Sequence, residues 1–256
     1  MPPPAVIGHM KITVITVALN NAATIGDTIA SVMGQAHRDI EHIVIDGMSS
    51  DSSMEIIGEW QRREPQRIRV VQERDTGIYN AINKGLRLAT GDIIGLLHGN
   101  DRFTSDDVLS RVAGAFKHDP RQYLYGDIHY RRPGSERAVR RYSAREFTPA
   151  MLCHGIAPPH PTLYMRRGLL DIIGPYKEDY LIAADFEMFV RLMLVHRLDG
   201  IYLPMDMVTM TTGGLSTRLY HRIVTNNREK MRALRENSIP VNPFSVLKRY
   251  LYGRKI

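Results

Sequence analysis

The 256-residue chain holds a single cysteine and a single tryptophan, and no apolar run approaches the roughly 18 residues that span a bilayer. One thiol, Cys153, makes neither an internal disulfide nor a metal cluster, which excludes a disulfide scaffold and a cysteine-based zinc site. The N-terminus also lacks the charged and then apolar order of a secretory signal. These absences lead us to expect a cytoplasmic protein.

The composition of the chain is typical of a globular protein. Hydrophobic residues make up 43% of the chain and charged residues 24%, which excludes disordered and fibrous proteins. Residues 1–10 are rich in proline and include Gly8-His9-Met10, which resembles a cloning scar, so we expect a leader outside the fold. The remaining length predicts one large domain, with or without an appendage.

The net charge of +7 is concentrated in two segments. Arg131–Arg145 carries six basic and one acidic residue, and Arg218–Ile256 carries ten basic and two acidic residues, so the rest of the chain is net acidic. Basic segments on an acidic body favour an anionic partner: a nucleotide diphosphate, a membrane surface or a nucleic acid. Because aromatic residues make up only 7% and no recognition motif is present, we expect no nucleic-acid partner.

Residues 216–256 predict a basic, helical C-terminal extension. Within it, Phe244, Leu247 and Leu251 recur near one helical face, with basic residues around them. Such a helix either rests on an anionic membrane surface, as in a peripheral protein at the inner face of the cell membrane, or packs against the protein body. The sequence favours neither alternative.

Apolar runs alternate with helical repeats through the first hundred residues. They predict strands at 11–18, 40–46, 67–72 and 92–97, with helices at 24–33, 52–63 and 78–89 between them. This alternation is typical of right-handed βαβ units, so we expect an α/β fold with a Rossmann-like, mostly parallel sheet flanked by helices. Beyond residue 102 the pattern weakens to a helix at 106–117, a strand at 122–125 and a helix at 185–195.

Polar residues follow each of the four predicted strands. They are Asn20, Asp46 to Asp51, Glu73 with Asp75, and His98 to Asp101. Because ligands of parallel sheets bind at the carboxyl ends of the strands, this edge is the expected binding site. The turn after the first strand lacks the closely spaced glycines of a dinucleotide site, and the chain has no Walker-type loop.

Three acidic residues are candidates for chemistry. Asp101 follows the most apolar strand, where a single carboxylate can hold Mg²⁺ or Mn²⁺ together with diphosphate oxygens and water; alternatively it belongs to an Asx turn. Asp185 and Glu187 are two apart on a predicted helix and face different directions, so only one of them can face a cleft. Either could instead be a favourable partner of the helix dipole.

The ordered motifs resemble the inverting glycosyltransferases of family 2, which have the GT-A fold. The resemblance rests on Thr13–Val17 with Asn20, Asp46–Asp51, Glu73–Gly85, Ala89–Asp92, His98–Asp101, Pro159–Thr162 and Ala183–Glu187. It covers about residues 11–215, of which 11–101 correspond to the nucleotide-sugar-binding half and 102–215 to the acceptor-binding half. Within the family, the chain is most similar to bacterial enzymes that build exopolysaccharides and cell-surface glycolipids.

The resemblance implies a role for each matched residue. Thr16, Asn20 and Asp46 would bind the nucleotide base, Asp75, Asn83, Lys84 and Asn100 would line the nucleotide pocket, Asp101 would hold the metal, and Asp185 would be the general base. Glu73, His98, His160 and Glu187 would lie near the donor sugar or the acceptor. The family usually has an acid at the position of Asn100, so this chain has one carboxylate fewer near its metal.

The implied function is transfer of a sugar, with inversion, from a UDP- or GDP-sugar to a hydroxyl of a glycan or lipid-linked acceptor. Inversion needs one displacement and one base, whereas retaining hydrolases need a second carboxylate as nucleophile. The alternative, suggested by Asn100, is a protein that binds nucleotide sugars without transferring them.

Overall fold

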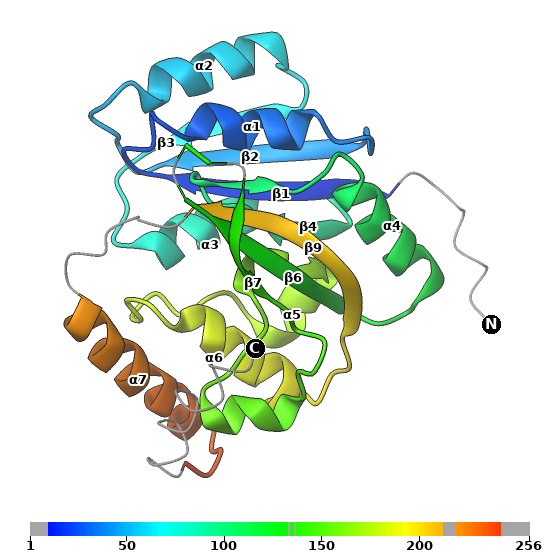
Figure 1. Ribbon diagram of the computed structural model, residues 1–256, viewed down its shortest axis with the longest axis vertical. Helices are drawn as coiled ribbons and strands as arrows, with labels where there is room; N and C mark the ends of the chain where they lie inside the picture. The colour runs from blue at the N-terminus through cyan, green and yellow to red at the C-terminus, as the bar shows by residue number, and fades with distance from the viewer. Residues whose placement is uncertain (1–9, 133, 136, 212–218, 242–256) are drawn as a thin grey trace.

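The computed structural model describes residues 10–132, 134–135, 137–211 and 219–241 (Figure 1). The expected leader, except for Met10, and the expected amphipathic helix at 244–256 lie outside the described residues, so the predicted membrane contact remains a prediction. None of the helices that the structure describes combines the length and the apolar character needed to cross a membrane.

The first hundred residues form the predicted βαβ series. Its members are β1 (Ile12–Ala18), α1 (Ile25–Met33), β2 (Ile40–Asp46), α2 (Ser53–Arg63), β3 (Ile68–Gln72), α3 (Ile78–Leu88) and β4 (Ile93–Leu96). The four strands pair in the order β3-β2-β1-β4, and every pairing is parallel. The carboxyl ends of these strands therefore meet at one edge, as the sequence predicts.

The second half is less regular and contains strands that the sequence pattern did not predict. The chain continues through β5 (Asp101–Phe103), α4 (Val108–His118), β6 (Tyr123–Arg131), β7 (Ala138–Tyr142), η1 (Pro149–His154), η2 (His160–Thr162), β8 (Tyr164–Arg166), η3 (Arg167–Leu169), α5 (Leu170–Ile173), α6 (Ala184–Val190), η4 (Arg191–Val195), β9 (Ile201–Thr211) and α7 (Leu219–Glu236). The predicted helix at 185–195 is thus α6 followed by one π-helical turn. The basic segment 131–145 includes β7, which pairs with β6.

The α/β class is confirmed, and the sheet is mixed: β1–β4, β6 and β9 run in one direction, whereas β5, β7 and β8 run in the other. Its order is β3-β2-β1-β4-β8-β6-β9-β5, with β7 on β6. Beyond β4, the described pairings are antiparallel except for β6 with β9. The short strand β8 lies antiparallel between β4 and β6, so β6 again runs in the direction of the first four strands.

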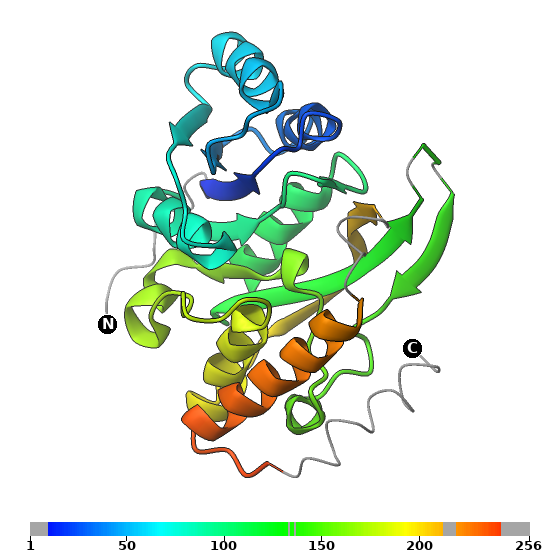
Figure 2. The ribbon, with the colours of Figure 1, turned by 90° about the vertical axis from the view of Figure 1, so that its left-hand side faces the viewer.

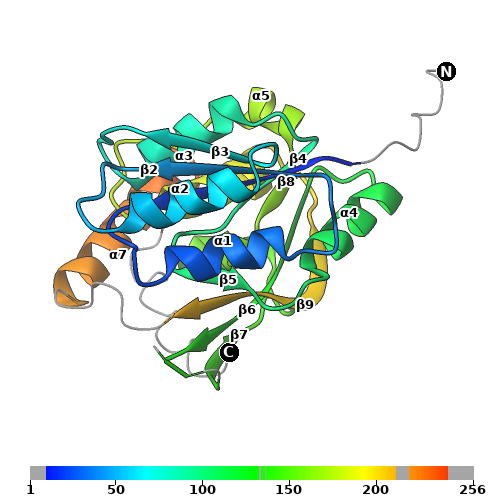
Figure 3. The ribbon, with the colours of Figure 1, turned by 90° about the horizontal axis from the view of Figure 1, so that it is seen from above.

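The side chains of β1 point alternately to the two faces of the sheet, and each face has its own hydrophobic core. Ile12 and Val14 pack into the cluster that includes α1, α2 and α4, whereas Ile15 and Val17 pack with α3 and α6. Figure 3 shows α1 and α2 over one face of the strands, and Figure 2 shows α6 and α7 side by side on the other. This second face carries the candidate site.

Candidate active site

The predicted nucleotide-binding residues lie in loops that hydrogen bonds tie together at the carboxyl edge of β1–β3. Asn20 has a positive φ of 54°, and its side-chain oxygen accepts a hydrogen bond from the Ser50 backbone N–H at 2.9 Å. The Asn20 backbone N–H in turn donates to Ser49 Oγ at 2.8 Å. The left-handed backbone, which asparagine tolerates better than most residues, thus joins the loop after β1 to the loop after β2.

Asp46, the last residue of β2, holds the loop that follows it through side-chain hydrogen bonds. Its side chain is fully buried and accepts hydrogen bonds from the Ser49 backbone N–H at 2.9 Å, from Ser49 Oγ at 2.5 Å and from Gln72 Nε2 at 3.3 Å. These three internal donors hold the Asp46 carboxylate in place, so it positions the loop after β2, and its contact with the base remains a prediction.

Lys84 on α3 fixes the third loop. Its Nζ lies 2.6 Å from Asp75 Oδ1, 2.7 Å from Glu73 Oε1 and 2.9 Å from the Arg74 carbonyl oxygen. A Cβ at Gly47 would lie 3.0 Å from Asp75 Oδ2, so the absence of a side chain at residue 47 lets the loop after β2 approach Asp75. Asn20, Asp75 and Lys84 are thus brought together, with Glu73 half exposed at the rim.

His98, His160 and Asp185 meet in a cavity of about 200 Å³, together with Tyr79 at the start of α3. The rings of His98 and His160 are 6.0 Å apart. Burial lowers the pKa of each to about 4, so both imidazoles are neutral at pH 7. Burial also raises the pKa of Asp185. A carboxyl whose pKa lies above the ordinary range is suited to accept a proton near neutral pH.

Asp185 also lines a second, larger cavity of about 640 Å³, here called the catalytic cavity. Its other lining residues include Tyr130 and Tyr142 from the β6–β7 pair, Ile223 and Lys230 from α7, and the Gly155–Pro161 segment. His160 and Ile182 border both cavities as well. Asp185 therefore stands between a small space near the carboxyl end of β4 and a larger one that opens toward β6, β7 and α7.

The wall that carries Asp185 is anchored by α7. Glu229 accepts hydrogen bonds from the backbone N–H groups of Leu181, Ile182 and Ala183 at 2.7, 2.9 and 2.9 Å. Lys230 Nζ donates to the Gly155 carbonyl oxygen at 2.6 Å, and its charge lowers the pKa of Asp185, opposing the larger effect of burial. These contacts fix the start of α6.

Tyr79 connects α3 to the same wall. Its hydroxyl donates to the Ile182 carbonyl oxygen at 2.5 Å and lies 3.5 Å from Asp185 Oδ1. The motif analysis assigned no role to Tyr79, Glu229 or Lys230. Tyr79 lies within a segment that carried the family resemblance, so its position was a usable signal, whereas no local pattern marks Glu229 or Lys230 among the charges of α7.

Asp101 is a buried carboxylate, and no residue that the structure describes forms a hydrogen bond with it. Its side chain is 2% exposed, neither oxygen accepts a hydrogen bond from the described residues, and burial raises its pKa to about 7. It pairs in the sheet with Met210, and its charge acts on Tyr130; both of these residues line the catalytic cavity. A cation would supply the missing partner, so this residue fits a metal ligand.

Among residues 10–132, 134–135, 137–211 and 219–241, Asp101 belongs to no group of three potential metal ligands. The neighbouring Asn100 is half buried, and the part of the chain that the structure describes contains no group of three His, Cys, Asp or Glu side chains arranged around one point. A cation here would need oxygens from its substrate and from water, as Mg²⁺ sites usually do.

Three predicted contact residues are buried in the fold instead. Thr16 Oγ1 lies 2.9 Å from His42 Nε2, and the amide of Asn83 exchanges hydrogen bonds with the Tyr176 backbone. Glu187 is fully buried, and its carboxylate binds Arg191 at 2.8 Å. Each of these side chains thus has internal partners, and Glu187 does not line either cavity that Asp185 lines, so their contacts with a substrate remain predictions.

Comparisons with known proteins agree with this geometry. The sequence profile described as Glycosyl transferase family 2 matches residues 13–173. A PGL/p-HBAD biosynthesis glycosyltransferase of Mycobacterium tuberculosis is 30% identical over 180 residues, which cover 70% of this chain and 68% of the relative. The chain belongs to glycosyl transferase family 2, and it is therefore a glycosyltransferase.

Two solved structures share the fold. One is Staphylococcus aureus TarS, residues 1–349, in complex with UDP-GlcNAc, with a TM-score of 0.69 and 18% identity over 88% of this chain and 66% of that one. The other is the mannosyltransferase PcManGT from Pyrobaculum calidifontis in complex with GDP-Man and Mn²⁺, with a TM-score of 0.63 and 20% identity over 88% of this chain and 65% of that one. The fold is thus GT-A.

Proposed function

We propose that this glycosyltransferase moves a sugar from a nucleoside diphosphate sugar to a hydroxyl of a glycan or glycolipid acceptor, with inversion, in the synthesis of a surface polysaccharide or glycolipid. The observation that carries the proposal is the position of Asp185, a half-buried carboxylate with a raised pKa at the boundary between two cavities. The likeness to proteins solved with UDP-GlcNAc and GDP-Man supports a nucleotide-sugar donor.

The donor nucleotide binds at the carboxyl edge of β1–β3. Asn20 and Asp75 offer hydrogen-bond acceptors to the base and ribose, and Lys84 holds Asp75 in place. The exposed side chains of Leu19 and Met48 flank Gly47 and supply apolar surface for a flat base. The diphosphate then extends toward Asn100 and Asp101, and the sugar toward His98 and His160.

The acceptor hydroxyl approaches from the catalytic cavity and donates its hydrogen bond to Asp185. As its oxygen attacks the anomeric carbon, the bond from that carbon to the diphosphate breaks, and Asp185 takes the hydroxyl proton. One displacement inverts the configuration. The neutral imidazoles of His98 and His160 line the cavity without competing with Asp185 for the proton.

Asp101 is the residue that would hold Mn²⁺ or Mg²⁺. When bound, the cation would stabilise the negative charge that develops on the diphosphate leaving group. Asp101 itself would be ionised by such a cation, against the effect of burial on its pKa.

A donor panel tests the proposal. UDP- and GDP-sugars are incubated with the protein and with simple glycoside acceptors, with and without Mn²⁺, and nucleotide release and product stereochemistry are followed. Metal-dependent release with an inverted product is expected. Tight donor binding without any release would instead make the chain a nucleotide-sugar-binding protein, the alternative that Asn100 suggests.

A further inference from the structure

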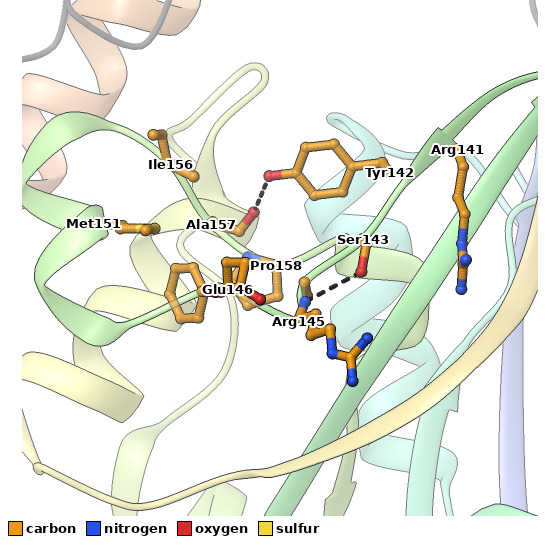
Figure 4. A pocket seen from close by; sticks show the side chains of 11 residues that line it. Arg141, Tyr142, Ser143, Arg145, Glu146, Met151, Ile156, Ala157 and Pro158 are labelled. Atoms are coloured by element: carbon orange, nitrogen blue, oxygen red, sulfur yellow. Dashed lines mark hydrogen bonds between the residues drawn. The ribbon is translucent and has the colours of Figure 1, made fainter. Parts of the chain in front are cut away.

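A second hollow adjoins the catalytic cavity and has no part in the chemistry described above (Figure 4). It has a volume of about 370 Å³ and is here called the side pocket. Its lining consists of residues 141–147 with Met151, Ile156, Ala157 and Pro158. The volume lies within the range of small-molecule sites, roughly 300–1,000 Å³.

The wall of the side pocket is held by a buried carboxylate. Asp127 on β6 is 1% exposed and accepts hydrogen bonds from the Ala144 backbone N–H at 2.8 Å and from Ser143 Oγ at 3.1 Å. Arg141 Nη2 donates to it at 2.9 Å, and the Tyr202 hydroxyl at 3.1 Å. A segment fixed at this many points is a preformed wall.

The side pocket shares a wall with the catalytic cavity. Tyr142, Ile156, Ala157 and Pro158 line both, and the Tyr142 hydroxyl donates to the Ala157 carbonyl oxygen at 2.9 Å, as Figure 4 shows. The two cavities therefore lie next to each other along this segment. The pocket lies on the acceptor side, because the nucleotide edge is formed by the loops after β1–β3.

The lining selects for an apolar group. Phe147, Met151 and Ile156 face the pocket together with the ring of Pro158. The charges at the rim do not favour one sign, since Arg145 stands next to Glu146 and Arg141 already binds Asp127 and Asp206. Burial of apolar surface is then the main source of affinity.

We propose that the side pocket binds an apolar aglycone of the acceptor, which is the ring or alkyl chain attached next to the sugar whose hydroxyl is glycosylated. The inference rests on the proposed function, because it assigns the acceptor to the catalytic cavity. It predicts that the enzyme distinguishes acceptors by their aglycone as well as by their sugar.

The test compares methyl, phenyl and octyl glycosides of glucose, galactose and mannose as acceptors at fixed donor concentration. For the sugar that is used best, the phenyl or octyl glycoside should have a kcat/KM at least about tenfold above that of the methyl glycoside, the gain expected from burying two or more methylene groups. The phenyl and octyl arms separate a ring from a chain as the preferred occupant.

Met151→Trp fills the pocket and is the decisive variant, because Met151 lines the side pocket and not the catalytic cavity. It should abolish the aglycone preference and leave the methyl glycoside and donor hydrolysis unchanged. The matched control is Ile172→Trp, at a 61% exposed position outside both cavities, which should keep the preference.

Two results would overturn the assignment: equal rates for all three aglycones in the wild type, or an aglycone preference that survives Met151→Trp. Failure of the proposed function looks different, because the wild type would then release no nucleotide from any donor, with or without an acceptor.

Discussion

Polar groups have opposite states in two regions: the nucleotide edge, formed by the loops after β1–β3, and the surroundings of the catalytic cavity. At the edge of β1–β3, Asp46 is satisfied by three internal donors, and Lys84 pairs with Asp75 and Glu73. Around the catalytic cavity, Asp101 has no hydrogen-bond partner among the described residues, and burial raises the pKa of Asp185. One region is stabilised by its polar groups, whereas the other keeps polar groups in an unfavourable state that substrate or cation would relieve under the proposed function.

The largest effect is expected for Asp185→Asn, which should change the catalytic cavity and leave the nucleotide edge unchanged. The amide accepts no proton, so kcat should fall about 10³-fold, within the range for loss of a general base, while the nucleotide edge stays intact. Donor affinity, measured by calorimetry, should change by less than about twofold. An equal loss of turnover and donor affinity would make Asp185 a structural residue.

Asp101→Asn separates two effects of the buried charge: its proposed contribution to metal binding and its destabilisation of the folded state. With Mn²⁺ present, donor affinity should fall by more than about tenfold, since the carboxylate ligand is lost. Without metal the variant should melt higher than the wild type. The difference in melting temperature between the variant and the wild type should grow as pH rises from 4 to 8. In the wild type, burial raises the pKa of the Asp101 carboxyl to about 7 in the folded state, so its ionisation destabilises that state.

Melting curves at pH 5 and pH 8, with and without Mn²⁺, check this prediction. A melting advantage that is the same at both pH values would contradict the buried-charge explanation. Donor affinity that is unchanged at saturating Mn²⁺ would remove Asp101 from the metal site.

Glu229→Gln loosens the wall without touching the substrate. Replacing the carboxylate leaves one oxygen and one NH2 group facing three backbone donors, at a cost of about 1.5–3 kcal/mol for hydrogen bonds to a charged group. We expect kcat to fall about tenfold at a temperature well below melting, with donor affinity unchanged. The measurement is a kcat and KM determination alongside donor titration.

Glu236→Gln is the matched control on the same helix. Glu236 pairs with Lys177 and Arg232 at a partly exposed position, where ion pairs contribute at most about 1 kcal/mol. Its turnover should stay near that of the wild type. Comparable losses in both variants would show that α7 acts only through general stability.

The smallest expected effect is a shift in pH dependence for Lys230→Met. The Lys230 charge lowers the pKa of Asp185 against the effect of burial, so its removal raises that pKa. The acid limb of the pH–rate profile should move to higher pH, and the rate at alkaline pH should remain within about twofold. A profile that keeps its acid limb in place would show that Asp185 does not set it.

The two regions also differ in how far the sequence predicts them. The βαβ series follows from local patterns: β2 occupies the predicted range 40–46, and the loops after β1–β3 meet at one edge as expected. Strands β5, β7, β8 and β9 were missed, because their pairings depend on partners far along the chain. The residue types of the site were predictable, but burial of Thr16, Asn83 and Glu187 was not, since it depends on packing between distant elements.

The three hydrogen bonds to Glu229 have a practical consequence for any shortened version of this enzyme. The family profile ends at residue 173, before both Asp185 and its anchor on α7. A fragment trimmed to the matched residues would keep the loops after β1–β3 and lose Asp185, the proposed proton acceptor. Even a fragment that ended after α6 would leave three amides without their carboxylate, so turnover serves as a sensitive reporter of whether α7 is docked.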